Sequence, residues 1–351
     1  MSKRNHIEGV IRLSTPLHCA MPGEKASLNE PTQTMKIKLI SGRDRQDTMP
    51  FFPGNGLRGR FRRKAASFVM PALVNGKKLP PELYAGLTCG AADNQPENEL
   101  SVEEALRYSK NVYMGLFGGG KRMLRSRYSV QDLVPITQST IAASLVPEKF
   151  EHPDEEREEK LVEDAFRLID YLHFIHKDDV MHVVRPDEMA AIIENAGATV
   201  SAYQAFNLAQ SATRKAEKKE NVSKEDRTKK TNLDNMMKIE VIAPGTPMYF
   251  RLDFDDGVTD AQVGLMLQSL QAVVDDNALG GWTRAGLGKY SIVRMNLMRN
   301  GVEFRVFKEE ADGYSLHESV MPFALSAQEQ VAALSRDEML SYFTSSKPQG
   351  E

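Results

Sequence analysis

The segment FFPGNGLRGRFRRKAASF, residues 51–68, constrains the fold of this chain more than any other stretch. Pro53 and Gly54 interrupt an extended segment, and Asn55 is a residue type that commonly caps the start of a helix. Apolar side chains then recur at helical spacing, which predicts a helix with one side on a hydrophobic core. These apolar positions are Leu57, Phe61, Ala65 and Phe68.

The same helix carries arginines and glycines away from its apolar side. Arg58 and Arg62 lie four positions apart and therefore share a face. Gly56 and Gly59 each cost about 1 kcal/mol of helix propensity, but glycine lets another group approach the backbone closely. The free amides of a first helical turn suit a phosphate. The alternative, an ordinary amphipathic helix with a basic solvent face, leaves both glycines unexplained.

The net charge of −3 conceals an uneven distribution of basic residues. Residues 48–81 and 105–131 contain no Asp or Glu, and residues 214–230 hold eight basic and four acidic residues. A chain that is acidic overall can therefore present a basic surface to a polyanion. The alternative is that these residues lie on scattered solvated faces.

The remaining periodicity predicts an α+β fold. Strands are expected at His6–Leu13 and Thr34–Ile40, and a long helix at Asp154–Ile175. The segment 82–98 is expected to be irregular, with Ser101 and Glu104 forming a capping box before a short helix. A second short helix is expected at Pro186–Asn195.

The C-terminal half predicts three further elements. Two apolar runs, Met237–Ile242 and Met248–Phe254, flank an APGTP turn and predict a hairpin. An apolar stripe predicts a helix over Thr259–Asn277, followed by a glycine-rich loop and a strand in residues 279–297. A last helix is expected at Glu329–Phe343. The whole indicates a ferredoxin-like or RRM-like core with an antiparallel sheet, whose broad face suits single-stranded RNA.

Several classes of site are excluded by spacing. Lys121 and Lys289 each follow a glycine, but neither segment fits the P-loop or the dinucleotide-binding pattern. His173, His176 and His182 do not have the spacing of a metal site, and the two cysteines form neither a disulfide framework nor a CxxC pattern. We expect no cofactor and no metal. No apolar run is long enough for a membrane span. The cysteine usage makes a reducing, cytoplasmic location the simplest expectation.

Four segments in order resemble the RAMP superfamily of CRISPR proteins, and within it the Cas-seven backbone family. They are PFFPGNGLRGRFRR, GLFGGG, IEVIAPGTPMYFRLDF and LGGWTRAGLGKYSI, with an amphipathic helix before the last. The length and the first segment look most similar to the type IV (Csf-type) members. The resemblance implies a single domain over residues 1–351 with insertions at 82–112 and 147–198, the helical finger region, and at 199–238, a protruding β-hairpin thumb.

The resemblance also implies which residues contact RNA. In the family, the segments matching residues 53–63, 118–120 and 280–288 line the groove that holds the guide RNA, and the thumb reaches over the neighbouring subunit. The implied RNA-binding residues are Asn55, Arg58, Arg60, Arg62, Arg63, Gly118, Gly119, Gly120, Lys121, Arg122, Arg125, Trp282, Arg284 and Lys289. The implied thumb residues are Arg214, Lys215, Lys218, Lys219, Lys229 and Lys230.

The implied function is a scaffold that binds crRNA and oligomerises along it. The implied partners are other copies of the chain, the large, Cas-five-like and crRNA-processing subunits, target DNA and a DinG-type helicase. Type III relatives carry a target-cleaving aspartate in the loop after the first strand, whereas residues 20–31 contain no Asp here. We therefore expect no enzymatic activity. The alternative is a metal-dependent ribonuclease that uses Glu24, Glu30, Asp44 or Asp47.

Overall fold

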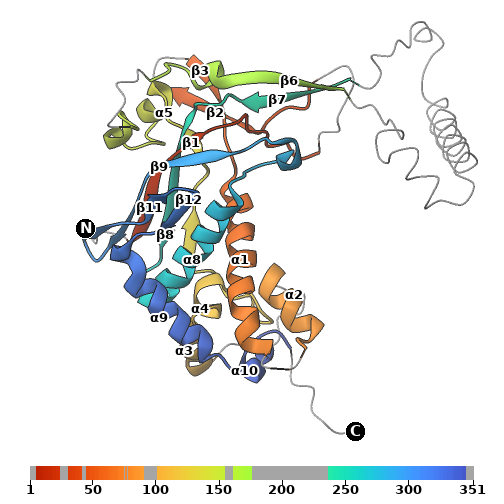
Figure 1. Cartoon of the computed structure of the whole chain (residues 1–351), viewed down its shortest axis with the longest axis vertical. Coiled ribbons are helices and arrows are strands. Elements are labelled where there is room, and N and C mark those ends of the chain that lie inside the picture. Colours follow the sequence, from red (N-terminus) through yellow and green to blue (C-terminus); the bar gives the residue numbers. More distant parts are fainter. Residues whose placement is uncertain are drawn as a thin grey trace, which may run out of the picture. The chain divides into compact units, whose positions relative to one another are not determined.

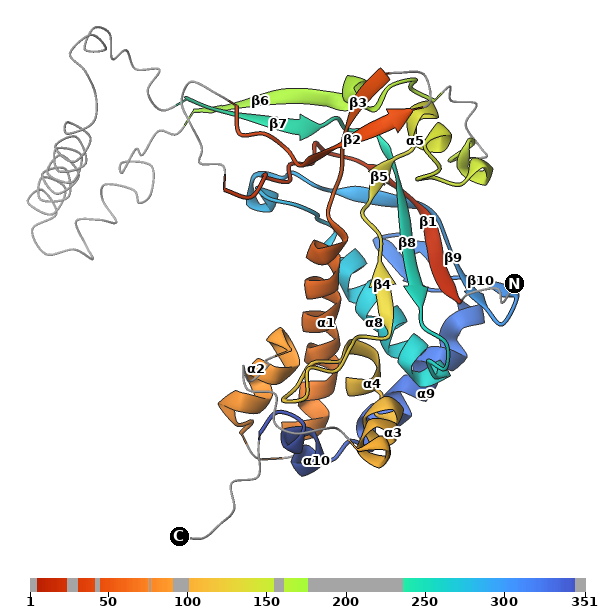
Figure 2. The same ribbon diagram turned by 180° about the vertical axis from the view of Figure 1, so that it is seen from behind.

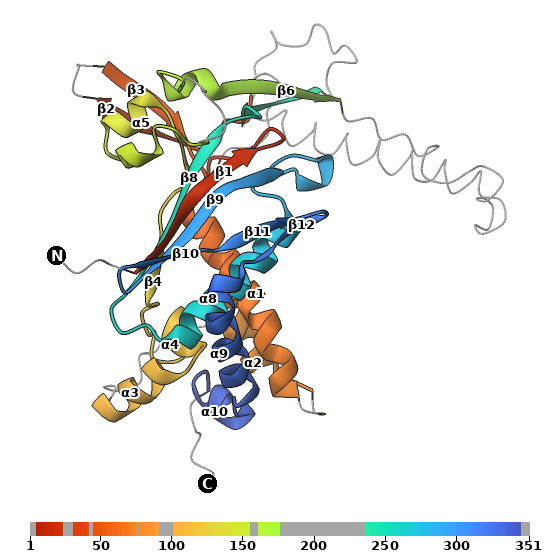
Figure 3. The same ribbon diagram turned by 60° about the vertical axis from the view of Figure 1, so that its left-hand side comes forward.

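The largest sheet of the described residues is six-stranded and antiparallel (Figures 1 and 3), with strand order β10-β9-β1-β8-β4 and β5 paired to β8. The structure is a computed structural model that describes residues 5–23, 31–41, 45–74, 76, 78–90, 101–154, 161–175 and 236–344. The central strands are β1 (His6–Leu13), β8 (Pro247–Phe254) and β9 (Tyr290–Arg299). The outer strands are β4 (Tyr128–Val130), β5 (Val134–Pro135) and β10 (Val302–Arg305).

Two long helices connect these strands in the ferredoxin-like order. The chain runs from β1 through α1 (Gly54–Val74) to β4, and from β8 through α8 (Asp260–Asp276) to β9. All neighbouring strands in this sheet are antiparallel. The predicted α+β class with an antiparallel ferredoxin-like core is therefore confirmed.

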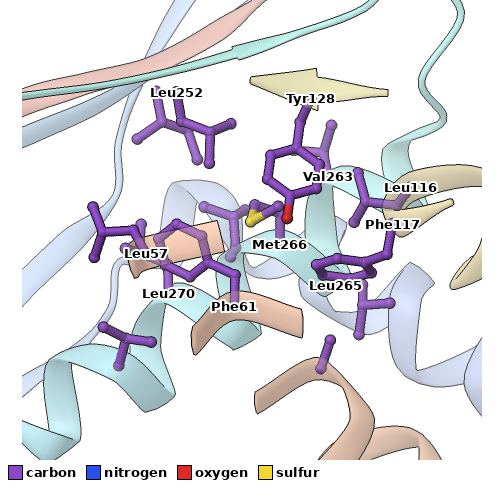
Figure 4. Close-up of a cluster of buried hydrophobic side chains, with 14 of the residues drawn as sticks. Leu57, Phe61, Leu116, Phe117, Tyr128, Leu252, Val263, Leu265, Met266 and Leu270 are labelled. Atoms are coloured by element: carbon purple, nitrogen blue, oxygen red, sulfur yellow. The ribbon is translucent and has the colours of Figure 1, made fainter. Parts of the chain in front are cut away.

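The main core lies between α1, α8 and one face of the sheet (Figure 4). Leu57 and Phe61 of α1 meet Met266 and Leu270 of α8, and Leu252 of β8 closes the cluster. All five side chains are at most 3% exposed. Alternation along β8 explains this arrangement, because successive side chains in a strand point to opposite faces.

The other helices pack around this layer. Figures 1 and 2 show α1 between α2 (Pro81–Cys89) and α8, and α9 (Met321–Ala332) packs along α8. Shorter helices are α3 (Val102–Lys110), α4 (Met114–Phe117), α5 (Gln138–Ala142) and α10 (Arg336–Ser341). The 3₁₀ turns are η1 (Glu148–Phe150), η2 (Ala165–Leu168), η6 (Thr283–Ala285) and η7 (Glu318–Val320).

Three two-stranded sheets complete the described elements. They pair β2 (Lys36–Ser41) with β3 (Arg45–Pro50), β6 (Ile169–Ile175) with β7 (Met236–Ile242), and β11 (Phe307–Glu310) with β12 (Gly313–Leu316). The chain divides into two compact units, residues 1–24, 33–170 and 240–351 in the first and residues 25–32 and 171–239 in the second. The predicted division into one domain with insertions at 82–112, 147–198 and 199–238 stays a prediction.

The long helix predicted over Asp154–Ile175 is wrong within the described residues. The chain forms η2 and then β6 there. Leu161, Ala165, Ile169 and Leu172 satisfy helical spacing, but residues 169–175 are rich in β-branched and aromatic side chains and pair with β7. Pairing with a distant strand decides between the two periodicities.

The hairpin predicted over residues 237–254 is also wrong. Both strands form, but β7 pairs with β6, whereas β8 pairs with β1. The turn between them instead contacts the end of β1, because Gly245 donates its amide to the carbonyl of Leu13 at 2.7 Å. An apolar run and a turn signal specify two strands but not their partners.

Other helix boundaries differ in smaller ways. Residues 82–89 of the segment expected to be irregular belong to α2, which has Pro81 at its first position, where proline is tolerated. The predicted helix at Glu329–Phe343 is two helices, α9 and α10, and α10 is capped by Ser335. The predicted helix at Pro186–Asn195 lies outside the described residues.

Two glycine substitutions are expected to change stability in opposite directions. A Cβ at Gly264 would lie 1.9 Å from the carbonyl oxygen of Phe323, so Gly264→Ala must push α9 from α8 and lower the free energy of unfolding by about 1–3 kcal/mol. A Cβ at Gly59 would meet only the flexible end of Arg63, so Gly59→Ala should raise it by about 0.5–1 kcal/mol. Urea unfolding of both variants measures this, and a shift of the same sign in both would contradict the packing.

Candidate nucleic-acid interface

The first turn of α1 is capped by a carboxylate from a distant segment. The helix begins at Gly54, and the Gly54 amide donates to Oδ1 of Asp132 at 2.8 Å. Asn55 is therefore an exposed residue inside the helix, not its N-cap as predicted, because Asp132 supplies that bond. A Cβ at Gly54 would lie 2.4 Å from the Val130 carbonyl oxygen, so this glycine serves chain packing.

Arg62 of α1 holds the first of two glycine-rich loops, which contains Gly118, Gly119 and Gly120, in place. Its guanidinium donates to the carbonyls of Phe117 and Gly118, where α4 ends, and lies 5.7 Å from the centre of the Phe117 ring. Helix carbonyls at a C-terminus carry partial negative charge, so this is a favourable site for a guanidinium. Arg62 is thus engaged in an intramolecular contact.

Arg60 makes the equivalent contact with the other long helix. It donates to the carbonyl of Ala278, just beyond the end of α8, and lies 3.8 Å from Oδ2 of Asp276. Lys64 donates to Oδ1 of the same aspartate at 2.6 Å. Arg60 and Lys64 of α1 therefore both contact the Asp276 carboxylate, and Arg60 also binds the backbone just beyond the end of α8.

The α1 strip, defined as Gly56, Gly59 and Arg63, lies between these two anchors. Arg60 and Arg62 are two positions apart, about 200° around the helix, so they point to opposite sides of it. Gly56, Gly59 and Arg63 are spaced by three and four residues, so they share the side of α1 that lies between the two arginines. Gly56 and Arg63 are exposed and Gly59 is half-buried. Within the described part of the chain, no acid or carbonyl partners the Arg63 guanidinium.

Arg58 lies one turn before Arg62, on the same side of α1. It is exposed and donates to the Ser126 hydroxyl at 2.9 Å, with its guanidinium 5.9 Å from the centre of the Tyr128 ring. Arg58 and Arg62 thus do share a face, as their spacing predicts, and that face contacts residues 117–128.

The triple-glycine segment, whose composition is compatible with a phosphate cradle or with a mobile surface loop, is a hydrogen-bonded turn. Gly118 and Gly120 are buried, and all three glycines have positive φ. The Gly119 amide donates to the carbonyl of Leu124, and the Gly118 amide donates to the carbonyl of Met114. A Cβ on Gly119 would meet the Gly90 carbonyl at 2.9 Å.

The cations after this turn differ in their engagement. Lys121 donates its backbone amide to the carbonyl of Tyr342 and its Nζ to the carbonyl of Thr344, both near the C-terminal end of the described chain. Arg122 lies 3.9 Å from Glu104. Arg125 is 87% exposed and 3.9 Å from Asp255, so it remains accessible to a ligand.

The second glycine loop, residues 279–289, exposes its tip. Leu279 donates its amide to Gly288, and Gly281 donates its amide to His18, which fixes the base of the loop. Residues 281–285 and Lys289 are exposed. Arg284 and Lys289 have no ion pair or side-chain hydrogen bond with any described residue, and Trp282 is 37% exposed.

The sheet face opposite the helices is not the open platform expected for single-stranded RNA. Val10, Val134, Phe150 and Tyr249 form a second buried cluster there. Next to it, Glu8 is 6% exposed and contacts a group of basic side chains and one phenol. Its partners are His6, Lys149, Tyr249 and Arg251. The aromatic rings of this face are therefore buried.

The remaining sequence candidates lie partly outside the described residues. This holds for all six thumb residues, for Glu24, Glu30 and Asp44, and for His176 and His182. Asp47 lies on β3 opposite Leu39, and His173 lies exposed on β6. In the described ranges, no three His, Cys, Asp or Glu side chains are placed to hold a metal ion, and no described helix is long and apolar enough to cross a membrane.

Two acids that contact α1 were not foreseen from the sequence: Asp132 caps the helix, and Asp276 pairs with Arg60 and Lys64. Asp132 and Asp276 bind α1 from 78 and 212 positions away, and no local pattern marks either of them. The uneven charge distribution was the available signal, but it does not show which cations are paired in the fold.

Comparison with known proteins identifies the family. The profile of the RAMP superfamily matches residues 10–291. The chain belongs to the RAMP superfamily. A search of curated proteins found no match. Among solved structures, the chain is similar to one described as "Type IV-B CRISPR Complex", with a TM-score of 0.48 and 12% identity, over 88% of this chain and 96% of that chain.

Arg62 and Arg63 are adjacent in sequence but should behave differently on substitution. Arg62→Ala removes charged hydrogen bonds to two carbonyls and should lower the free energy of unfolding by about 2 kcal/mol. Arg62→Lys should not recover the lost free energy of unfolding, because an ammonium group cannot reproduce the paired N–H donors of the planar guanidinium. Arg63→Ala should stay within about 0.5 kcal/mol of the wild type. The midpoints of urea unfolding measure these differences. Equal losses of stability in both alanine variants would contradict the conclusion that Arg62 is bound and Arg63 is unpaired.

Glu8 is expected to contribute an acid-sensitive part of the stability. Burial would raise the pKa of Glu8, but hydrogen bonds and charges from His6 and Lys149 outweigh it and lower the pKa to about 2. A lowered pKa means that the contribution is complete above the ordinary value of 4.5 and is lost as the pH falls toward 2. The stability difference between wild type and Glu8→Gln, followed by urea unfolding, should shrink across this interval. A stability difference between wild type and Glu8→Gln that does not change with pH would exclude this acid-sensitive contribution of Glu8.

Proposed function

We propose that this protein is a crRNA-binding backbone subunit of a type IV CRISPR effector complex. It oligomerises along the guide RNA and presents its bases to target DNA, without catalysis of its own. Membership of the RAMP superfamily over residues 10–291 supports RNA binding. The order of the four sequence segments supports the backbone role and the type IV assignment.

The observation that carries this proposal is the α1 strip with its unpaired arginine. Arg63 lies beside two glycines, and Arg60 and Arg62 join the same helix to a glycine loop on each side. One of these loops exposes Arg284 and Lys289, and residues 279–289 contain no acid. Cations with accessible backbone between them suit a sugar–phosphate chain read without regard to sequence.

We propose a smaller set of RNA contacts than the sequence implies. Arg60 and Arg62 are proposed to position the two loops, because their guanidinium groups are bound to carbonyls. Arg63, Arg284 and Lys289 are proposed to contact phosphates directly, with Arg58 and Arg125 at the border. In this proposal base pairing supplies sequence recognition, and the protein recognises the backbone of the guide.

The proposed partners follow from this role. They are further copies of the chain, a large subunit, a Cas-five-like subunit, a crRNA-processing subunit, target DNA and a DinG-type helicase. The purified protein should carry RNA of defined length. Native mass measurement with extraction of bound nucleic acid tests this, and protein free of RNA that also fails to bind added single-stranded RNA would refute the proposal.

Removing the three proposed phosphate contacts should weaken binding to all RNA sequences alike. For the triple variant Arg63→Ala, Arg284→Ala, Lys289→Ala, the log–log salt dependence of the affinity should become shallower by about 2, at about 0.7 per contact on single strands. Anisotropy titrations with two unrelated RNAs at several salt concentrations measure the slope.

The matched control removes the same charge from other surfaces. Lys78→Ala, Lys110→Ala, Lys308→Ala changes three exposed lysines on other segments of the chain. It should retain most of the wild-type slope. An equal loss in both triple variants would attribute binding to net charge alone, and a loss confined to one RNA sequence would contradict backbone recognition.

A further inference from the structure

Trp282 has a backbone conformation that tryptophan rarely adopts. It is the single tryptophan of the chain, and its φ of 59° lies in the left-handed region that favours glycine. Its carbonyl accepts the amides of Ala285 and Leu287 at 2.9 and 3.4 Å, which holds this conformation. Bulky residues kept in such a conformation cluster at functional sites.

The loop that carries Trp282 is fixed at its base. Gly281, the preceding residue, donates its amide to the His18 carbonyl at 2.9 Å, and Gly288 donates to the Pro16 carbonyl at 2.8 Å. Leu279 and Gly288 are joined by a further backbone bond at 2.9 Å. Trp282 itself is 37% exposed. The indole is therefore held on a supported turn, and part of it faces solvent.

The charges on the same loop as the indole favour an anionic partner. Arg284 and Lys289 lie two and seven positions further along the same exposed loop, and neither is paired with a described acid. Arg60 joins the base of this loop to α1 through the Ala278 carbonyl. An exposed aromatic ring flanked by cations is the combination with which proteins hold single-stranded nucleic acid, because phosphates meet the cations and a base stacks on the ring.

We propose that Trp282 stacks on a nucleobase of the bound guide RNA while Arg284 and Lys289 hold the adjacent phosphates. This inference rests on the proposed function and adds a base contact to a backbone contact. Stacking is tolerant of sequence, since every base has a π-face, so it agrees with a guide of any sequence. It fixes the position of one base relative to each subunit.

The single tryptophan makes the contact directly measurable. Intrinsic tryptophan emission of the full-length protein is titrated with a single-stranded RNA and with an RNA of the same length that is abasic throughout. We expect quenching by the first, and binding with little quenching by the second, because the abasic strand keeps its phosphates. Binding of both strands is followed independently by anisotropy of an RNA label.

Three substitutions separate stacking from other contributions. Trp282→Phe keeps an aromatic ring and should retain affinity within about threefold. Trp282→Leu keeps apolar surface without a ring, and Trp282→Gly suits the positive φ without a side chain. Both should lose about tenfold in affinity for the ordinary RNA, in line with the usual contribution of one stacked base, and change little for the abasic RNA.

The outcomes distinguish this inference from the proposed function. RNA that binds without quenching, or Trp282→Leu that binds as tightly as Trp282→Phe, would overturn stacking and leave the backbone role intact. Absence of binding to either strand would refute both. An emission change on self-association without RNA would place Trp282 in a protein interface and also overturn the proposal.

Discussion

The contacts between two α1 arginines and the carbonyls at two helix ends hold the candidate interface together. Arg62 binds the carbonyls where α4 ends, and Arg60 binds the carbonyl just beyond α8. Arg62 satisfies backbone acceptors that the C-terminus of α4 leaves without internal partners, and Arg60 satisfies a backbone acceptor in the segment that follows α8. Because the two side chains leave α1 on opposite sides, one helix positions both glycine loops. Since α1 is itself fixed to the sheet by Leu57 and Phe61, the strip between the loops has a defined place on the fold.

The parts of the fold that were predictable are those specified by local chemistry. The helix expected at Thr259–Asn277 forms as α8, because Thr259 and Gln262 make a capping box and Asn277 ends it in the left-handed conformation. The first strand forms over His6–Leu13 as expected. By contrast, residues 169–175 and the partners of β7 and β8 depend on pairing between distant strands. A short apolar run is compatible with both periodicities, and its partner decides.

The candidate site was predictable as a region but not as a set of contacts. The sequence indicates that arginines and glycines gather in residues 54–63, and the fold exposes part of that segment. It could not separate Arg62 from Arg63, since their difference depends on carbonyls 55 and 56 positions away. Nor could it show that two of the three consecutive glycines, Gly119 and Gly120, pack against Gly90 and Tyr342. The opposite sheet face is filled for the same reason, by segments remote in the chain such as Phe150.

Gly59 has no role in packing that the fold explains. Gly54 is required because Val130 approaches its backbone, and a Cβ at Gly56 would lie 3.1 Å from the Phe52 ring. A Cβ at Gly59 would meet only the movable end of Arg63, although glycine inside a helix costs about 1 kcal/mol relative to alanine. What glycine provides there is open backbone next to an unpaired guanidinium. Under the proposed function, that opening is where the sugar–phosphate chain lies against α1, and Arg63 neutralises it from the side.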